Sequence, residues 1–266
     1  MKFSQYLSAF SAGSVALLAF AGNASAVTLE LGLAIDGSGS ISSSDFALQI
    51  DGYVDAFSDP NFFSTVVEPS PFDDIAVGVY QFATGVTEEI AFTTISSQAD
   101  ADALATLIGS ITQADGATNF VDTVNTITSD IFSNAIDSDR QVIDFSTDGV
   151  PTTGGGQTDS IAAADAARAN GIDAINSLGV GGGADISFLE AFSDADNVDP
   201  DDNTGFVIAV DSFDEFAPAV ADKLVAEITE PPEEIPFEAE GTMGLVALGG
   251  FFWYRKRQQQ KRSADV

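Results

Sequence analysis

The stretch LELGLAIDGSGS, residues 29–40, decides the fold. Its first part, Leu29–Ile35, is apolar except for one charge, and it stops abruptly at an acidic segment rich in glycine and serine. A short apolar run of this kind is typical of a strand buried on both faces, as in a parallel sheet. We therefore predict a buried parallel strand that opens into a loop at Asp36.

The chain that follows alternates between helix and strand patterns. A helix with an apolar stripe starts at the caps Ser42–Ser44 and ends at Asp59-Pro60. Further strands are predicted at 75–83, 89–95, 141–146, 172–180 and 206–210, and further helices at 98–111, 120–131, 159–169, 186–192 and 213–228. Strands 75–83 and 89–95 form a predicted hairpin, with the second strand at the sheet edge. The pattern predicts an α/β fold, doubly wound, with a mostly parallel sheet, one antiparallel edge strand and helices on both faces.

Five polar residues stand where predicted strands end or a helix begins. Asp36, Ser38 and Ser40 follow the first strand, Thr118 precedes the helix that starts at residue 120, and Asp148 follows strand 141–146. Ligands of open α/β sheets collect at the carboxyl edge of the strands. We therefore expect these five side chains to meet at one point.

Two carboxylates and three hydroxyls are the hard oxygen ligands that Mg²⁺ prefers, with Mn²⁺ or Ca²⁺ as alternatives. Waters would complete the octahedron and leave one position exchangeable. An isolated Asp-Gly-Ser-Gly-Ser is more often a simple turn. Thr118 and Asp148, each at the expected strand or helix boundary, favour a metal site instead.

These segments together resemble a known site. Ile35–Ser40, Gly116–Thr118 and Thr147–Gly149 resemble the metal-ion-dependent adhesion site of von Willebrand A domains. Phe46–Gln49 and Val142–Ser146 resemble a bacterial exported subgroup of that family whose role is unassigned. The resemblance covers almost all of residues 27–229 and implies a Rossmann-like fold.

The resemblance also implies roles for the five residues. Ser38, Ser40 and Thr118 would touch the metal through their hydroxyls, and Asp36 and Asp148 would act directly or through water. The vacant position would accept an Asp or Glu carboxylate of a protein partner. The implied role is binding at the cell surface or in the extracellular matrix, with no catalysis.

The composition excludes several classes of function. Residues 27–254 carry 40 acidic and 3 basic side chains, so this region repels nucleic acid and anionic lipid headgroups. The chain has no cysteine and no histidine. Disulfides, Ser-His-Asp and Cys-His catalysis and histidine-bound zinc are therefore excluded, which leaves oxygen ligands for a metal.

The two ends of the chain predict export. Residues 1–26 have the charged start, apolar stretch and small-residue cleavage site of a signal peptide. An acidic, proline-rich linker at 230–240 leads to the apolar run 241–254, which is shorter than the roughly 20 residues of a spanning helix. The basic tail 255–266 would stay in the cytoplasm. We expect at least transient anchoring in the bacterial inner membrane.

The C-terminal segment, residues 235–257, resembles an exosortase-type sorting signal of the Pro-Glu-Pro kind. It departs from that pattern because no Pro-Glu-Pro is present. Cleavage after transient anchoring and permanent retention in the membrane both stay open.

Three weaker features are interpreted as structural and not as functional sites. Asp144 lies in a strand that should be buried, and we expect hydrogen bonds from neighbouring loops to satisfy it, the alternative being a protonated carboxyl. The acidic loop 194–203 is a candidate calcium site but is expected to be a solvated run of charge. Gly179–Gly183 lacks the phosphate-loop pattern and is expected to be a turn.

Two other functions compete with partner binding. One is a structural envelope or matrix protein with a vestigial site, and the other is a magnesium-dependent phosphotransferase. The second acidic residue that such enzymes carry two positions after the nucleophile is Ser38 in this chain. The sequence leaves the identity of the partner and the oligomeric state open.

Overall fold

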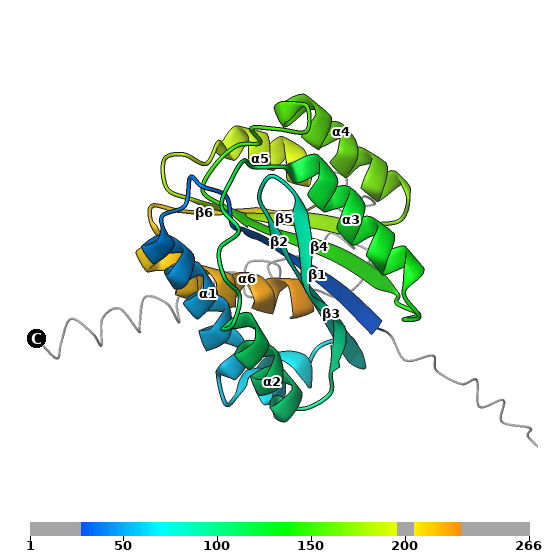
Figure 1. Cartoon of the computed structure of the whole chain (residues 1–266). Helices are drawn as coiled ribbons and strands as arrows, with labels where there is room; N and C mark the ends of the chain where they lie inside the picture. The colour runs from blue at the N-terminus through cyan, green and yellow to red at the C-terminus, as the bar shows by residue number, and fades with distance from the viewer. Residues whose placement is uncertain (1–27, 196–204, 230–266) are drawn as a thin grey trace, which may run out of the picture. The chain divides into compact units, whose positions relative to one another are not determined.

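The described part of the protein has a central six-stranded sheet with helices on both faces (Figure 1). The computed structural model describes residues 28–195 and 205–229, which belong to one compact unit. The strands are β1 (Thr28–Asp36), β2 (Asp74–Phe82), β3 (Val86–Ile95), β4 (Arg140–Thr147), β5 (Ala174–Val180) and β6 (Val207–Val210). Their order is β3-β2-β1-β4-β5-β6, and all neighbours are parallel except β2 and β3. The predicted fold class, including the antiparallel edge strand, is confirmed.

The helices form two layers. They are α1 (Ser43–Ser58), α2 (Gln98–Ile108), α3 (Phe120–Ser133), α4 (Gly156–Ala169), α5 (Ile186–Ser193) and α6 (Phe216–Thr229). Helices α1, α2 and α6 pack on one face of the sheet, and α3, α4 and α5 pack on the other (Figure 1). A π-helix at Phe63–Val67 and a 3-10 turn at Phe213–Glu215 complete the described elements.

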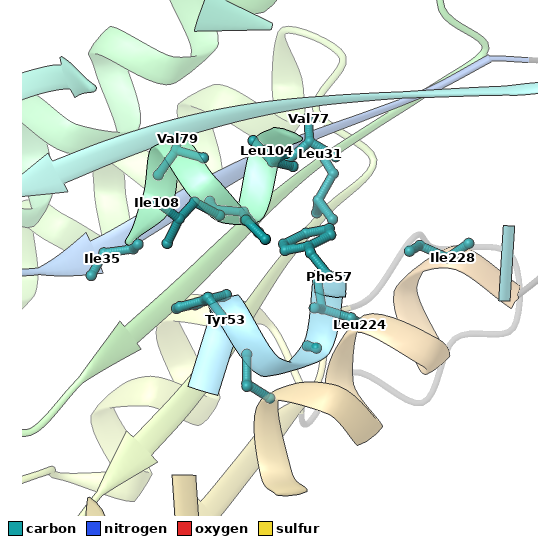
Figure 2. Close-up of a cluster of buried hydrophobic side chains, with 14 of the residues drawn as sticks. Leu31, Ile35, Tyr53, Phe57, Val77, Val79, Leu104, Ile108, Leu224 and Ile228 are labelled. Carbon is teal, nitrogen blue, oxygen red and sulfur yellow. The ribbon is translucent and has the colours of Figure 1, made fainter. Parts of the chain in front are cut away.

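Each face of the sheet has its own hydrophobic core. The core under α1, α2 and α6 contains Tyr53, Phe57, Ile108 and Leu224 (Figure 2). The core on the other face contains a cluster of aromatic rings around Phe120, which contacts Phe82, Phe145, Phe188 and Phe192. Burial of both faces explains why the inner strands β1, β2, β4 and β5 are mainly apolar, whereas the edge strand β3 has many exposed polar residues.

Most predicted element ends are close to the observed ones. Ser42 caps α1 by accepting a hydrogen bond from the Asp45 amide at 3.2 Å, as its position before the helix predicts. The start of α4 was placed three residues too late, because Gly155 in the left-handed region (φ 86°) begins the helix at Gly156. Gly179 and Val180 belong to β5, so the turn expected at Gly179–Gly183 begins only at Gly181, which has φ 72°.

The prediction that neighbouring loops satisfy the buried Asp144 side chain was wrong. The side chain is fully buried, but its ionic partner is Lys223 of α6 and not a neighbouring loop. The sequence pattern could not reveal this contact, because the two residues lie far apart in the chain and meet only when α6 covers the sheet.

Several predictions fall outside the described residues. They concern the signal peptide (1–26), the linker, apolar run and tail (230–266), and nearly all of the acidic loop 194–203. Within 28–195 and 205–229, no helix combines the length and apolarity that crossing a membrane requires. The predictions for the chain ends therefore stay predictions.

Gly52 sets the close packing of α1 against α6. A Cβ at this position would lie 2.6 Å from Cδ1 of Phe216 and 3.2 Å from Cα of Ala217. We expect Gly52→Leu to lower the free energy of unfolding by about 2–3 kcal/mol, because overpacking outweighs the better helix propensity. Urea unfolding measures this, with the exposed neighbour Asp51→Leu as a control that should change by less than about 0.5 kcal/mol. Equal effects of the two variants would contradict the packing argument.

Candidate metal centre

The first loop of the candidate site leaves the central strand β1 at Asp36. The Asp36 carboxylate accepts a hydrogen bond from the Ser38 amide at Oδ1 (2.8 Å), which folds the chain into a tight turn. The Asp36 carbonyl accepts from Nε2 of Gln49 on α1 at 2.8 Å. These bonds fix both the carboxylate and the backbone at the point where the strand order reverses between β1 and β4, which is where open α/β sheets bind ligands.

The second loop, which leads to Thr118, is joined to the first by its backbone. The Asp115 amide donates to the Gly37 carbonyl at 2.8 Å, and the Gly39 amide donates to the Gly116 carbonyl at 2.9 Å. Asp115 and Gly116 have positive φ angles of 61° and 111°, which turn the chain toward the first loop. A Cβ at Gly39 would lie 2.4 Å from Oδ1 of Asp115, so the glycine permits this approach.

The third loop, after β4, contacts both of the others. Ser40 Oγ donates to Oδ1 of Asp148 at 2.7 Å, and Thr147 Oγ1 donates to Oδ2 of Asp36 at 2.6 Å. Thr118 and Thr152 exchange two hydrogen bonds of 2.9 Å, one from each amide. The structure therefore brings together the three loops that carry the five predicted residues.

The spacing of the oxygens suits a small octahedral ion. Ser38 Oγ lies 3.0 Å from Ser40 Oγ, which lies 2.7 Å from Oδ1 of Asp148. Neighbouring ligands at about 2.1 Å from Mg²⁺ are about 3.0 Å apart in an octahedron. Asp36, Ser38 and Thr118 are buried, whereas Ser40 is exposed and Asp148 half-buried, so the group opens to solvent on one side.

The two carboxylates lie in an environment that disfavours their charge. Burial raises the pKa of Asp36 to about 6, opposed by hydrogen bonds from Ser38 and Thr147 and reinforced by the charge of Asp148. Burial also raises the pKa of Asp148, and the charge of Asp45 adds to this effect. A bound dication would offset both costs, so the donor set fits a divalent metal.

The candidate site differs from centres built on clustered acidic or histidine ligands. Within the part of the chain that the structure describes, no three or more Asp, Glu, His or Cys side chains group as a metal site. The predicted ligand set contains only two carboxylates, and hydroxyls supply the rest. A metal bound here would keep a larger share of its positive charge than one held by three carboxylates.

Three residues outside the predicted five hold the site in place. Thr147 bonds the Asp36 carboxylate, Gln49 bonds the Asp36 carbonyl, and Gln113 donates to the carbonyls of Ser38 and Ile41 at 3.2 and 2.8 Å. Gln49 had a detectable signal, because it is a polar residue on the apolar stripe of α1 and is fully buried. Gln113 precedes the second loop and gave no such signal.

A family model described as "Protein of unknown function (DUF1194)" matches residues 26–232. No curated protein matches the chain in sequence.

Solved structures show the fold. Proximal thread matrix protein 1 from the mussel byssus is 20% identical, with a TM-score of 0.57 over 77% of this chain and 46% of that one. A von Willebrand factor type A protein from Catenulispora acidiphila is 16% identical, with a TM-score of 0.56 over 76% and 43%. BatB from Bacteroides thetaiotaomicron, a conserved hypothetical protein, is 18% identical, with a TM-score of 0.51 over 75% and 98%. The fold is von Willebrand A-like.

The coverage of these structures differs. The chain spans less than half the length of the mussel protein and nearly all of BatB. Another structure of the mussel protein has a zinc-occupied metal-ion-dependent adhesion site, with 21% identity and a TM-score of 0.55 over 75% of this chain and 45% of that one.

Proposed function

The chain belongs to the DUF1194 family, and from this premise and the von Willebrand A-like fold we propose that it is a divalent-metal-dependent protein-binding module. The observation that carries the proposal is the convergence of three loops, joined by hydrogen bonds between Gly39 and Gly116, Ser40 and Asp148, and Thr118 and Thr152. The metal-bearing site of the mussel protein supports the same chemistry by analogy of fold alone.

Five side chains would hold the ion. In this proposal Ser38, Ser40 and Thr118 bind through hydroxyls, and Asp36 and Asp148 bind directly or through water. Mg²⁺ suits the donor spacing, with Mn²⁺ or Ca²⁺ as alternatives. When bound, the ion supplies an electrophilic position for an incoming carboxylate.

Because the surface is strongly acidic, binding of an acidic partner would depend on this ion. Residues 27–254 carry 40 acidic side chains against 3 basic ones, so the metal-free domain repels an acidic partner. A dication beside the exposed Ser40 would offset the charges of Asp36 and Asp148 and offer a positive centre with an open coordination position there. A partner's Asp or Glu is therefore attracted there and repelled elsewhere, which makes binding depend on the metal.

We propose a binding role without catalysis. The position two residues after Asp36, where aspartate-based phosphotransferases carry a second acidic residue, is Ser38. The acidic surface would also repel a phosphorylated substrate. These points argue against the phosphotransferase, while a vestigial site in a structural protein remains the competing proposal.

The proposed location is the cell envelope or cell surface. The predicted signal peptide and the basic tail support export with at least transient membrane anchoring. The byssal matrix protein and the aerotolerance-related membrane protein from Bacteroides fragilis, at 19% identity and a TM-score of 0.50, are consistent with this location.

Metal-dependent capture of an envelope protein tests the proposal. The purified full chain is immobilised and exposed to an envelope fraction with Mg²⁺, with a chelator, and after chemical blocking of the fraction's carboxylates. We expect the wild type to capture a protein only when Mg²⁺ is present and the carboxylates of the fraction are unblocked. The Asp36→Ala, Asp148→Ala double variant should capture none under any of the three conditions. Capture that persists in chelator would favour the structural role, and magnesium-dependent release of phosphate from a phosphomonoester would favour the enzyme.

The affinity for Mg²⁺ should depend on pH. The pKa of Asp36 is raised to about 6, so protons compete with the metal below that value. We expect the Kd for Mg²⁺ to rise by about tenfold for each pH unit below about 6 and to level off above it. Calorimetric titrations from about pH 5 to about pH 8 measure this. A Kd that is constant over the range would exclude Asp36 from the ligands.

A further inference from the structure

A second group of charged side chains lies in the core between the sheet and α6, away from the candidate metal site. Asp144 of β4 and Lys223 of α6 are both fully buried, and Glu227, one helical turn after Lys223, is 1% exposed. Lys223 Nζ is in direct contact with Oδ1 of Asp144 and lies 3.1 Å from Oε1 of Glu227. An amine and two carboxyl groups therefore meet at one point that water does not reach.

The surroundings of this charged cluster are apolar or already hydrogen-bonded. Leu224 and Ile228 on α6 belong to the core on this face (Figure 2). Asn176, the neighbour of Asp144 in the sheet register, donates to Oε1 of Glu227 at 2.9 Å and accepts from the Phe206 amide at 3.0 Å. Apart from the Lys223 contact, no described residue satisfies either oxygen of Asp144 by a hydrogen bond.

Burying charge in this cluster is energetically unfavourable. Two carboxylates and one ammonium leave an uncompensated negative charge in the core, and the loss of hydration makes a buried ion unfavourable even when it is paired. Burial lowers the pKa of Lys223, although the charge of Glu227 opposes the effect. The amine is thus shifted toward its neutral, nucleophilic form, and the proton that it gives up can pass to the Asp144 oxygen in direct contact with it.

We propose that Lys223 and Asp144 condense to an intramolecular isopeptide bond that ties α6 to β4. Lys223 Nζ, as the free amine, attacks Cγ of the protonated Asp144, and a C–N bond forms. Glu227 accepts a proton from the nitrogen and returns it to the departing hydroxyl, so the C–O bond breaks and one water leaves. The products are a neutral amide and an ionised Glu227, with the total charge unchanged.

The geometry favours this reaction in two ways. The reacting groups are already in contact inside a rigid core, and well-oriented intramolecular reactions reach effective concentrations of about 10⁵ M or more. Relative to the state in which Lys223, Asp144 and Glu227 are all ionised, the product has one buried charge in place of three, which relieves most of the desolvation cost. Exclusion of water protects the amide from hydrolysis.

The cross-link would stabilise an exported protein that has no disulfide. The chain contains no cysteine, so a covalent tie needs other side chains. Residues 144 and 223 bracket the segment from β4 to α6, and linking them restricts the unfolded chain as a disulfide does. The C-terminal helix would then stay attached when force or denaturant acts on the domain.

Peptide mass spectrometry of the full chain tests the proposal. The protein is purified under native conditions, denatured and digested with trypsin, which cleaves after Arg140, Arg168 and unmodified Lys223. We expect peptide 141–168 linked to a peptide that contains an uncleaved Lys223, at a mass lower than their sum by one water. Unlinked 141–168 and a free peptide 169–223 as the dominant products of the wild type would overturn the proposal, without reference to any variant.

Variants test the role of each residue in forming the cross-link. Lys223→Met and Glu227→Gln should each abolish the linked peptide, whereas Asp214→Asn, an exposed change near the start of α6, should retain it. A linked peptide that persists in Glu227→Gln would overturn the role of Glu227. Loss of one ammonia with attachment at Asn176 would overturn the assignment to Asp144.

Discussion

Replacing Asp36 and Asp148 together by asparagine is expected to raise the Kd for Mg²⁺ at least about 100-fold, or about 2.7 kcal/mol. The change keeps the shape of both side chains but removes the two negative charges that balance the dication. Isothermal titration of the metal-free full chain with Mg²⁺ measures the effect. Circular dichroism should show an unchanged fold, because the change relieves the cost of burying the Asp36 charge.

The matched control for this variant is Asp45→Asn. Asp45 lies close enough to raise the pKa of Asp148, but it is not among the proposed ligands. Its removal should change the Kd by less than about threefold, as expected for a solvent-screened charge. A loss as large as that of the double variant would mean that general surface charge, and not coordination, attracts the cation.

Phe120→Ala is expected to lower the free energy of unfolding by about 3–5 kcal/mol. The ring is fully buried and contacts Phe82, Phe145, Phe188 and Phe192, with centroid distances of 5.0 to 5.5 Å. It begins α3 directly after Thr118-Asn119, so a cavity here should also loosen the second loop of the metal site. Urea unfolding and Mg²⁺ titration measure the two effects.

The control on the same helix is Phe132→Ala. The Phe132 side chain is 49% exposed, so the same substitution should cost less than about 1 kcal/mol and leave the Mg²⁺ affinity unchanged. Equal destabilisation by the two variants would contradict the assignment of Phe120 to the centre of the aromatic core.

The sequence was sufficient for the architecture because the apolar patterns are strong. The run Leu29–Ile35 is short and stops at an acidic glycine-rich loop, which favours a buried strand, and the stripe from Phe46 to Phe57 has the spacing of an amphipathic helix. The hairpin of β2 and β3 followed from the turn at Gly85. Errors at element ends arose where a glycine in the left-handed region moved the boundary, as at Gly155.

The grouping of the candidate ligands also followed from the sequence, since parallel strands end at one edge of the sheet. The hydrogen bonds that fix these ligands could not be predicted from the sequence. Thr147 and Gln49 reach Asp36 from two other elements, and a periodic pattern does not encode a contact between elements. The meeting of Asp144 with Lys223 has the same origin, because it requires α6 to lie on the sheet.

Anomalous diffraction from crystals of the full chain grown with Mn²⁺, measured at the manganese absorption edge, shows directly whether the three loops hold one metal ion. We expect one peak among the loops, about 2.1 to 2.3 Å from the hydroxyl oxygens of Ser38, Ser40 and Thr118. Asp36 and Asp148 should lie beside that ion. An ordered site with no peak, or a peak that Thr118 and Asp148 do not share with the Asp36 loop, would rule out the proposed metal site.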